Sequence, residues 1–247
     1  CSSELTARYT AQLVEGESLI DLTGGFGVDT TVLSERFKDV IYVEQNPELV
    51  AIAQNNFKAF GLSHIHVQSE LAEVALQRIH SVDWIFIDPA RRGKSGGKLV
   101  SIGDCEPNII EMQEIFMQKA QRVLVKMSPM LDIKQALREL HHVVEVHVIA
   151  VQNECKELLL VVDYQQQETL DPMIYAVNIK STVESEMFSF HLSQEEEYLA
   201  FYSSTVKEFI YEPNVSLLKA GAFNTLSKVL NIEKLHSHEE VVREVKQ

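Results

Sequence analysis

Apolar runs and amphipathic stretches alternate regularly from residue 17 to about residue 145. Short apolar runs bounded by turn residues indicate buried strands, and apolar residues repeating every three to four positions indicate helices. The alternation predicts an α/β domain in which helices cover a parallel sheet. The expected strands are Ser18–Leu22, Val40–Glu44, His64–Val67, Trp84–Asp88 and Arg122–Lys126, and the expected helices are Thr30–Phe37, Pro47–Phe60, Leu71–Ile79, Asn108–Lys119 and Ile133–Leu140.

The pattern changes after the fifth expected helix. Two β-rich runs, Val143–Val151 and Glu157–Asp163, are separated only by the polar stretch Gln152–Lys156, which predicts an antiparallel hairpin. Parallel strands closed by such a hairpin are typical of the Rossmann-like sheet of class I methyltransferases. A dinucleotide-binding dehydrogenase continues with parallel strands instead.

A linker is expected at residues 165–172, because this stretch is polar and ends in a proline. A smaller α+β unit should follow it. Its expected elements are strands at Ile174–Ile179 and Met187–Leu192, a solvated helix start at Glu195–Glu197, and an amphipathic helix at Ser216–Leu230.

Composition restricts the setting of these units. The 247 residues, 45% of them hydrophobic, can bury a substantial core. No apolar run approaches the ~18 to 20 residues that cross a bilayer, and the N-terminus lacks a signal-peptide layout, so we expect a cytoplasmic protein. Cys1, Cys105 and Cys155 are too scattered for a disulfide framework, and the nine histidines show no metal-ligand spacing, so no metal is expected. The net charge of −14 disfavours a polyanionic partner unless a local basic patch outweighs it.

A glycine-rich loop, Asp21–Thr30, follows the first expected strand and opens a helix. Glycines allow a sharp turn and a close approach of the backbone to a ligand. The loop could hold a pyrophosphate at the helix N-terminus, or it could pass under the methionine end of S-adenosylmethionine, whose ammonium favours carbonyls and Asp21. The spacing does not choose between these cofactors, and a glycine turn without a ligand is a third possibility. The candidate residues are Asp21, Gly24, Gly25, Phe26 and Gly27.

Two acids follow the next two expected strands. Glu44, with Gln45 beside it, comes about twenty residues after the loop, where a carboxylate can accept both hydrogen bonds of a ribose diol. That position serves S-adenosylmethionine and NAD equally. Glu70, followed by Leu71, is the acid that would meet an adenine amino group in a class I methyltransferase. Each acid could instead be a solvated residue at a helix N-terminus.

The segment Asp88–Gly93 follows the fourth expected strand and discriminates better than the loop. It resembles the fourth motif of amino- and base-methylating enzymes, in which the acid or the adjacent carbonyl accepts hydrogen bonds from the nucleophile and aligns it with the sulfonium methyl. Asp88 and Pro89 are therefore the catalytic candidates, and a dehydrogenase has no reason to carry them here. The alternative is an aspartate that caps a turn before proline.

Basic side chains are concentrated beside this motif. Arg91, Arg92, Lys94 and Lys98 lie in a glycine-rich loop that either holds the phosphates of an RNA substrate or is an ordinary surface loop. At the end of the fifth expected strand, Lys126 and Ser128 are further candidates for contact with substrate.

The chain resembles bacterial class I S-adenosylmethionine-dependent methyltransferases with a THUMP-like C-terminal domain. The resemblance implies a methyltransferase domain at 1–165, a small ferredoxin-like unit at 170–210, and an incomplete THUMP-like segment at 211–247. Because the chain starts inside the family's Cys-Ser-Ser-Glu motif, we expect a fragment. The matching strings are Cys1–Tyr9, Asp21–Thr30, Tyr42–Asn46, Asp88–Arg92, Asn153–Leu158 and Tyr211–Gly221.

The leading hypothesis is methyl transfer from S-adenosylmethionine to a nitrogen or carbon of a nucleic acid base, with tRNA or rRNA as the partner because true THUMP domains accompany tRNA-modifying enzymes. A second hypothesis is a cofactor-binding module with weak or no catalysis that acts through a partner. The acidic charge supports it, as does Ala90, which stands where RNA base enzymes usually carry a second proline. An NAD-dependent oxidoreductase is a third, disfavoured by Asp88-Pro89 and the hairpin.

Overall fold

A computed structural model describes residues 2–91, 102–203, 205, 209–235 and 242–244. The chain divides into two compact units, of which the first comprises Cys1–Val144 and Leu159–Thr169 and the second comprises Glu145–Leu158 and Leu170–Gln247. The division passes through the hairpin predicted near residues 143–163, so each unit contains part of both hairpin strands.

The first unit is built on the predicted parallel sheet. Its strand order is β9-β7-β4-β1-β2-β3, and the last five of these strands run parallel to one another. This is the Rossmann-like methyltransferase arrangement, which confirms the predicted fold class. The strands are β1 (Ser18–Asp21), β2 (Asp39–Val43), β3 (Ile65–Gln68), β4 (Val82–Ile87), β7 (Ala120–Met127) and β9 (Glu154–Asp163), the last only from Leu159 onward in this unit.

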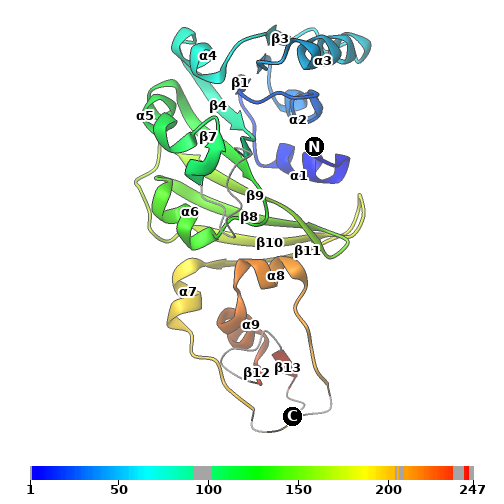
Figure 1. The fold of residues 1–247 in the computed structure, drawn as a ribbon. Coiled ribbons are helices and arrows are strands. Elements are labelled where there is room, and N and C mark those ends of the chain that lie inside the picture. Colours follow the sequence, from blue (N-terminus) through cyan, green and yellow to red (C-terminus); the bar gives the residue numbers. More distant parts are fainter. Residues whose placement is uncertain (1, 92–101, 204, 206–208, 236–241, 245–247) are drawn as a thin grey trace. The chain divides into compact units, whose positions relative to one another are not determined.

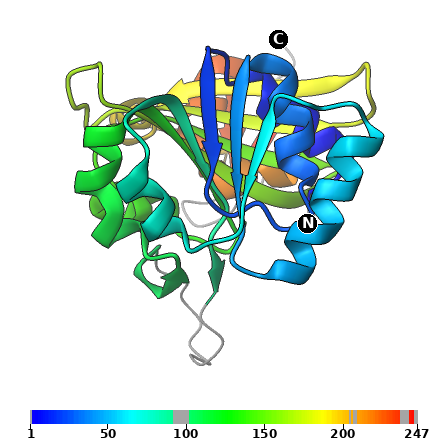
Figure 2. The same ribbon diagram turned by 90° about the horizontal axis from the view of Figure 1, so that it is seen from above.

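Helices cover both faces of this sheet. Helices α1, α2 and α3 lie on one face and α4, α5 and α6 on the other (Figures 1 and 2). No helix in the described part of the chain is both long and apolar enough to span a membrane. The bounds are α1 (Glu4–Gln12), α2 (Val28–Leu33), α3 (Pro47–Ala59), α4 (Ala72–Arg78), α5 (Ile109–Lys119) and α6 (Ile133–Glu139), with 3-10 turns η1 (Ser34–Arg36) and η2 (Ile102–Asp104).

Local side-chain caps explain where three of these helices begin. The side chains of Asn46, Asn108 and Asp132 accept hydrogen bonds from the backbone N–H groups of the first turns of α3, α5 and α6. Such caps satisfy donors that lack a partner within the helix, and each contributes about 1 kcal/mol. Pro47 occupies the first turn of α3, where its missing N–H has no effect. These caps confirm the predicted starts of α3 and α6 and place that of α5 within one residue.

Apolar side chains of the strands form the core of the first unit. Ile20, Val40, Ile85 and Leu124 lie on four adjacent strands and are fully buried. Burial of side chains of this size stabilises the fold by roughly 1.5 to 3 kcal/mol each. The carboxyl ends of β1, β2 and β4 are therefore held in fixed positions relative to one another.

The second unit contains the tight turn of the predicted hairpin. Strand β8 (Val143–Val151) is a neighbour of β9 in the sheet, and only Gln152 and Asn153 separate them. Both turn residues have positive φ, 50° and 61°, as a type I′ two-residue hairpin turn requires. The hairpin is thus present, and β9 starts at Glu154 rather than at the predicted Glu157.

The rest of the second unit extends from this hairpin. Strand β10 (Met173–Ile179) pairs in parallel with β8 and antiparallel with β11 (Ser185–His191). The single helix predicted over Ser216–Leu230 is wrong. Gly221, with φ of 73°, ends one helix in the left-handed conformation, and a second helix starts two residues later. The remaining elements are α7 (Leu192–Glu197), α8 (Val215–Ala220), α9 (Phe223–Leu230), β12 (Ile232–Lys234) and β13 (Val242–Glu244).

Candidate functional site

A cleft of about 310 Å³ opens in the first unit at the carboxyl ends of β1, β2 and β4. Open α/β sheets bind their ligands at this edge. Six predicted site residues line the cleft, namely Gly25, Glu44, Gln45, Glu70, Leu71 and Asp88. The other lining residues are Leu22, Thr23, Ala72, Glu73, Ala90, Glu106 and Pro107.

The glycine loop is shaped by the side chains beneath it. A Cβ atom on Gly24 would lie 2.0 Å from the Tyr42 ring, so only glycine fits there. The Tyr42 hydroxyl donates a hydrogen bond of 2.5 Å to the carbonyl of Gly25. Gly27 is the N-cap of α2 with φ of 76°, and a Cβ there would lie 2.6 Å from Phe57. Gly24 and Gly27 therefore shape the loop, whereas Gly25 lines the cleft.

Asp21 lies inside the loop and away from the cleft. Its side chain is buried, one oxygen accepts a hydrogen bond from the Thr23 N–H at 3.0 Å, and the other accepts one from the Thr30 hydroxyl at 2.5 Å. Burial raises the pKa of Asp21 to about 7, although both hydrogen bonds favour its ionised form. The structure thus gives Asp21 the position of a loop-organising residue, and its contact with a cofactor ammonium stays a prediction.

Glu44 connects the second strand to the glycine loop. One of its carboxylate oxygens accepts a hydrogen bond from the Gly25 N–H at 2.9 Å and the other accepts one from the Asn46 N–H at 2.8 Å. These contacts hold the carboxylate at the cleft, where its remaining lone pairs are available to a ligand. Gln45, the next residue, is exposed and also lines the cleft.

Glu70 and two apolar side chains complete the predicted cofactor set. Arg78 donates hydrogen bonds of 2.9 and 2.8 Å to the two oxygens of Glu70. Leu71 and Phe26 are half exposed, at 50% and 52%. Leu71 lines the cleft, while Phe26 is not among the lining residues.

Asp88 occupies the end of the fourth strand and reaches the cleft. Its N–H donates a hydrogen bond of 2.7 Å to the Thr23 hydroxyl, and its Oδ2 lies 2.7 Å from Lys126 Nζ. In the described part of the chain, no hydrogen bond to its Oδ1 is found. Burial raises the pKa of Asp88, and the charge of Lys126 opposes this effect. Pro89 follows Asp88 but is not among the lining residues.

The chain folds back beside Asp88. Strand β5 (Ala90–Arg91) pairs antiparallel with β6 (Cys105–Glu106), which brings Glu106 and Pro107 to the cleft. Arg92, Lys94 and Lys98, predicted to meet RNA phosphates, lie outside the described residues, as does the side chain of Arg91.

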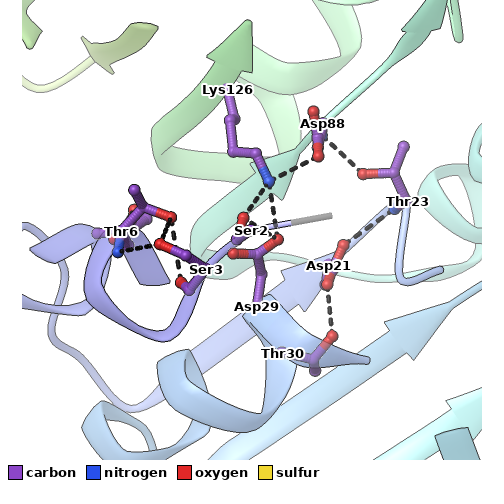
Figure 3. Close-up of polar contacts among 10 residues, drawn as sticks. Ser2, Ser3, Thr6, Asp21, Thr23, Asp29, Thr30, Asp88 and Lys126 are labelled. Atoms are coloured by element: carbon purple, nitrogen blue, oxygen red, sulfur yellow. Dashed lines mark hydrogen bonds and ion pairs between the residues drawn. The ribbon is translucent and has the colours of Figure 1, made fainter. Parts of the chain in front are cut away.

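Lys126 lies behind Asp88, not in the cleft. Its Nζ donates hydrogen bonds to Ser2 Oγ at 2.6 Å and to Asp29 Oδ2 at 2.8 Å, in addition to its contact with Asp88 (Figure 3). An ammonium group has three donors, so this arrangement leaves none for a substrate. Ser128 does not line the cleft either, and its Oγ accepts a hydrogen bond from the Met130 N–H at 3.3 Å. Neither residue lines the described cleft, and their contact with substrate stays a prediction.

The charge of the cleft is strongly one-sided. Five carboxylates, those of Glu44, Glu70, Glu73, Asp88 and Glu106, line it, and no cationic side chain does so in the parts of the chain that the structure describes. A low-dielectric cleft lined by one sign of charge attracts a ligand of the opposite sign. Arg78 and Lys126 pair with two of these carboxylates, those of Glu70 and Asp88, and the remaining excess of negative charge suits a cationic ligand. Among the same residues, no group of three or more His, Cys, Asp or Glu side chains could hold a metal ion.

Sequence reasoning missed three residues of this site. Thr23 links Asp21 to Asp88, because its N–H donates a hydrogen bond to Asp21 and its hydroxyl accepts one from the Asp88 N–H. Glu106 precedes the cap of α5, but only the pairing of β5 with β6 shows that it reaches the cleft. Asp29 stands inside the glycine loop, and no signal in the sequence marked its contact with Lys126.

Comparisons with known proteins agree with this fold. Over all of its length the chain matches the crystal structure of a candidate methyltransferase from Porphyromonas gingivalis W83, with 30% identity and a TM-score of 0.90, and it spans 62% of that chain. A modification subunit of a candidate type I restriction enzyme from Vibrio vulnificus YJ016 shares the fold, with 13% identity, a TM-score of 0.53, and coverage of 81% of this chain and 56% of that chain.

Two further matches cover shorter segments. A 77-residue stretch, 31% of this chain and 16% of the relative, is 29% identical to the 23S rRNA (uracil(1939)-C(5))-methyltransferase RlmD of Chromohalobacter salexigens. The model of a ferredoxin-like domain matches residues 209–239. This ferredoxin-like match falls where the sequence resemblance implied a THUMP-like segment.

Proposed function

We propose that this chain transfers a methyl group from S-adenosylmethionine to a base of RNA, with tRNA or rRNA as the substrate. The observation that carries the proposal is Asp88, which lies at the end of a core strand, lines the cleft, and keeps one carboxylate oxygen without a hydrogen bond among the described residues. A carboxylate in that position can accept a hydrogen bond from an incoming nucleophile.

The residues of the cleft fit the cofactor by charge and by donor set. S-adenosylmethionine carries a sulfonium and an ammonium, which suit a cleft with five carboxylates. Gly25 would contribute backbone, Glu44 would accept hydrogen bonds from the ribose, and Glu70 with Leu71 would meet the adenine. The cofactor would supply an electrophilic methyl group on sulfur.

The protein's own part in the reaction is mainly positional. Asp88 would accept an N–H or O–H hydrogen bond from the acceptor group and so orient its lone pair toward the methyl group. Alignment of two reacting groups in a site that excludes water can supply much of the rate of such a transfer. The neighbouring Ala90, which lines the cleft, would shape the wall against which the acceptor packs.

An RNA base as acceptor is supported by two kinds of similarity. The relative from C. salexigens is named as a 23S rRNA methyltransferase, although the matched stretch covers 16% of its length. The strings shared with methyltransferases that carry a THUMP-like domain point to the same substrate class. The chain spans 62% of the P. gingivalis chain that it matches.

A specific observation favours a second candidate, a cofactor-binding module that acts through a partner. The described cleft carries five carboxylates and no cationic side chain, which repels the phosphates of RNA. In that case a partner would supply the positive surface. Binding of cofactor without turnover on any RNA pool would favour this candidate.

Two measurements test the leading proposal. Calorimetry should detect binding of S-adenosylhomocysteine, and Glu44→Ala should weaken it by roughly tenfold or more, because each lost hydrogen bond to a charged group costs about 1.5 to 3 kcal/mol. Incubation of total tRNA and rRNA with labelled S-adenosylmethionine should then give incorporation that Asp88→Ala abolishes. A wild-type protein that binds no S-adenosylhomocysteine would overturn the proposal.

A further inference from the structure

Three segments that are distant in sequence meet at the ammonium group of Lys126. Ser2 precedes α1, Asp29 lies in the first turn of α2, and Asp88 follows β4, yet all three contact this Nζ within 2.8 Å (Figure 3). Cofactor binding explains the glycine loop and Glu44, but it does not explain why these three polar side chains converge on a lysine outside the cleft.

The position of Lys126 follows from strand register. Strands β4 and β7 are parallel neighbours in which Ile87 pairs with Val125. The residues that follow this pair, Asp88 and Lys126, therefore also lie side by side. The Lys126 side chain is only 7% exposed, whereas that of Asp88 is 36% exposed. The contact therefore joins a buried cation to the inner oxygen of a carboxylate that reaches the cleft.

Asp29 makes the lysine a fixed part of the fold. Its carboxylate is 14% exposed, and its Oδ1 is buried without a hydrogen-bond partner among the described residues. A buried carboxylate that lacks one of its hydrogen bonds is costly unless a cation lies close to it. Burial disfavours the charge on Lys126, but Asp29 and Asp88 outweigh this and raise its pKa above the usual value, so it stays charged.

We propose that Lys126 is a positioning residue for the methyl transfer: held by Asp29 and Ser2, it fixes Oδ2 of Asp88, stabilises the negative charge of that carboxylate, and leaves Oδ1 as the acceptor for the nucleophile. The consequence for catalysis rests on the proposed function, whereas the effect on the Asp88 carboxylate does not. The charged and titratable groups that act on Asp88 are Lys126 on β7, Asp29 on α2 and the N-terminal amino group of the chain.

The direct test is a carboxyl NMR titration of Asp88 in the full chain with ¹³C-labelled aspartate, assigned with Asp88→Asn. In Lys126→Met the pKa of Asp88 should rise by about one pH unit or more, because an opposite charge within hydrogen-bond distance favours ionisation by that amount. In Asp29→Asn it should fall, since a neighbouring negative charge is removed. A variant that merely loosens the fold would not give shifts of opposite sign.

Lys38→Met is the matched control. Lys38 forms an exposed ion pair with Glu17 at 2.7 Å, its side chain is 77% exposed, and it contacts none of the residues around Asp88. This variant should leave the pKa of Asp88 unchanged. An Asp88 pKa that is the same in wild type, Lys126→Met and Asp29→Asn would overturn the inference.

The kinetic test uses the RNA pool that gives the highest incorporation. Lys126→Met should lower the transfer rate by roughly tenfold or more and move the acidic limb of the pH–rate profile to higher pH, with S-adenosylhomocysteine affinity within about threefold of wild type. Lys126→Arg, which keeps the charge, should retain the wild-type limb. If the wild type binds no cofactor, the proposed function fails while the titration still decides the inference. If Asp88→Ala abolishes transfer but Lys126→Met does not move the acidic limb of the pH–rate profile, the positioning role of Lys126 is wrong and the proposed methyl transfer stands.

Discussion

Asp21 and Asp88 are the same residue type at the carboxyl ends of neighbouring strands, yet their surroundings give them different hydrogen-bond partners and different access to the cleft. Asp21 is buried and both its oxygens accept hydrogen bonds within the glycine loop. Asp88 lines the cleft, and only one of its oxygens is held, by Lys126. Burial raises the pKa of both, but a cation opposes this effect strongly only at Asp88. Position on the sheet edge therefore does not fix the role of an acid, and the groups around it do.

Removal of the Asp88 charge should give the largest effect on activity. Asp88→Asn keeps the size of the side chain but replaces an anionic acceptor with a neutral amide, so methyl transfer to the RNA pool should fall roughly 100-fold or more. Binding of S-adenosylhomocysteine should change little. The measurement is label incorporation together with calorimetry.

The control for this substitution is Asp39→Asn, an aspartate that pairs with His66 on the surface and is 57% exposed. It should transfer at the wild-type rate. Full activity in Asp88→Asn would show that the Asp88 carboxylate has no catalytic role that distinguishes it from Asp21.

The second prediction concerns the pH dependence of stability, which should come from Asp21. Because the pKa of Asp21 is raised to about 7 in the folded protein, the folded state holds a proton that the unfolded chain has already released. The resulting stability is fully present below pH 4 and is lost as pH rises through 7. A difference of about three pH units corresponds to roughly 4 kcal/mol.

Asp21→Asn should remove this slope, because an amide side chain does not titrate. The amide can still accept a hydrogen bond from the Thr23 N–H and donate one to the Thr30 hydroxyl. The free energy of unfolding, measured with urea between pH 4 and pH 8, should then vary less with pH in Asp21→Asn than in wild type. Asp39→Asn serves again as the control and should keep the wild-type slope. A slope unchanged in Asp21→Asn would show that another group titrates.

The third prediction tests how rigidly the loop around Asp21 is built. In Gly24→Ala the new methyl group would clash with the Tyr42 ring at 2.0 Å, so the free energy of unfolding should fall by about 2 to 3 kcal/mol. Gly61→Ala is the matched control, because its φ is 71° but no atom lies within 4 Å of the added Cβ. It should lose only about 1 kcal/mol from the left-handed backbone. Equal losses in the two variants would argue against a loop held by Tyr42.

The sequence predicted the part of the fold that depends on apolar periodicity. The five parallel strands of the first unit and the hairpin follow from that pattern, and their bounds agree within a few residues. Helix α1 was missed because its buried face consists of Ala7, Ala11, Thr6 and Thr10, which carry little apolar contrast. The break at Gly221 was missed because one glycine does not interrupt an amphipathic pattern.

The residues of the candidate site could be predicted only where they directly follow a strand. Glu44 and Asp88 each follow a strand, so the sheet edge predicts that they share a cleft, and both line it. The contact of Lys126 with Asp29 depends on the register of β4 with β7 and on where α2 packs, which hydrophobic patterning does not determine. The exclusion of Asp21 from the cleft follows from hydrogen bonds within the loop, which the spacing of its glycines does not reveal.

The smallest expected effect comes from Thr23, the residue that links the two acids. Its N–H donates to Asp21 and its hydroxyl accepts from the N–H of Asp88. Thr23→Val keeps the shape and the first bond but leaves the Asp88 N–H without its acceptor, which should lower the free energy of unfolding by about 1 kcal/mol. The pH slope that originates at Asp21 should persist, whereas methyl transfer should fall several-fold because Asp88 loses one of its two fixed points. Thr23→Ser, which keeps the hydroxyl, should transfer at nearly the wild-type rate. A loss of the pH slope in Thr23→Val would show that the two carboxylates act as one coupled unit, and their separate roles would then have to be abandoned.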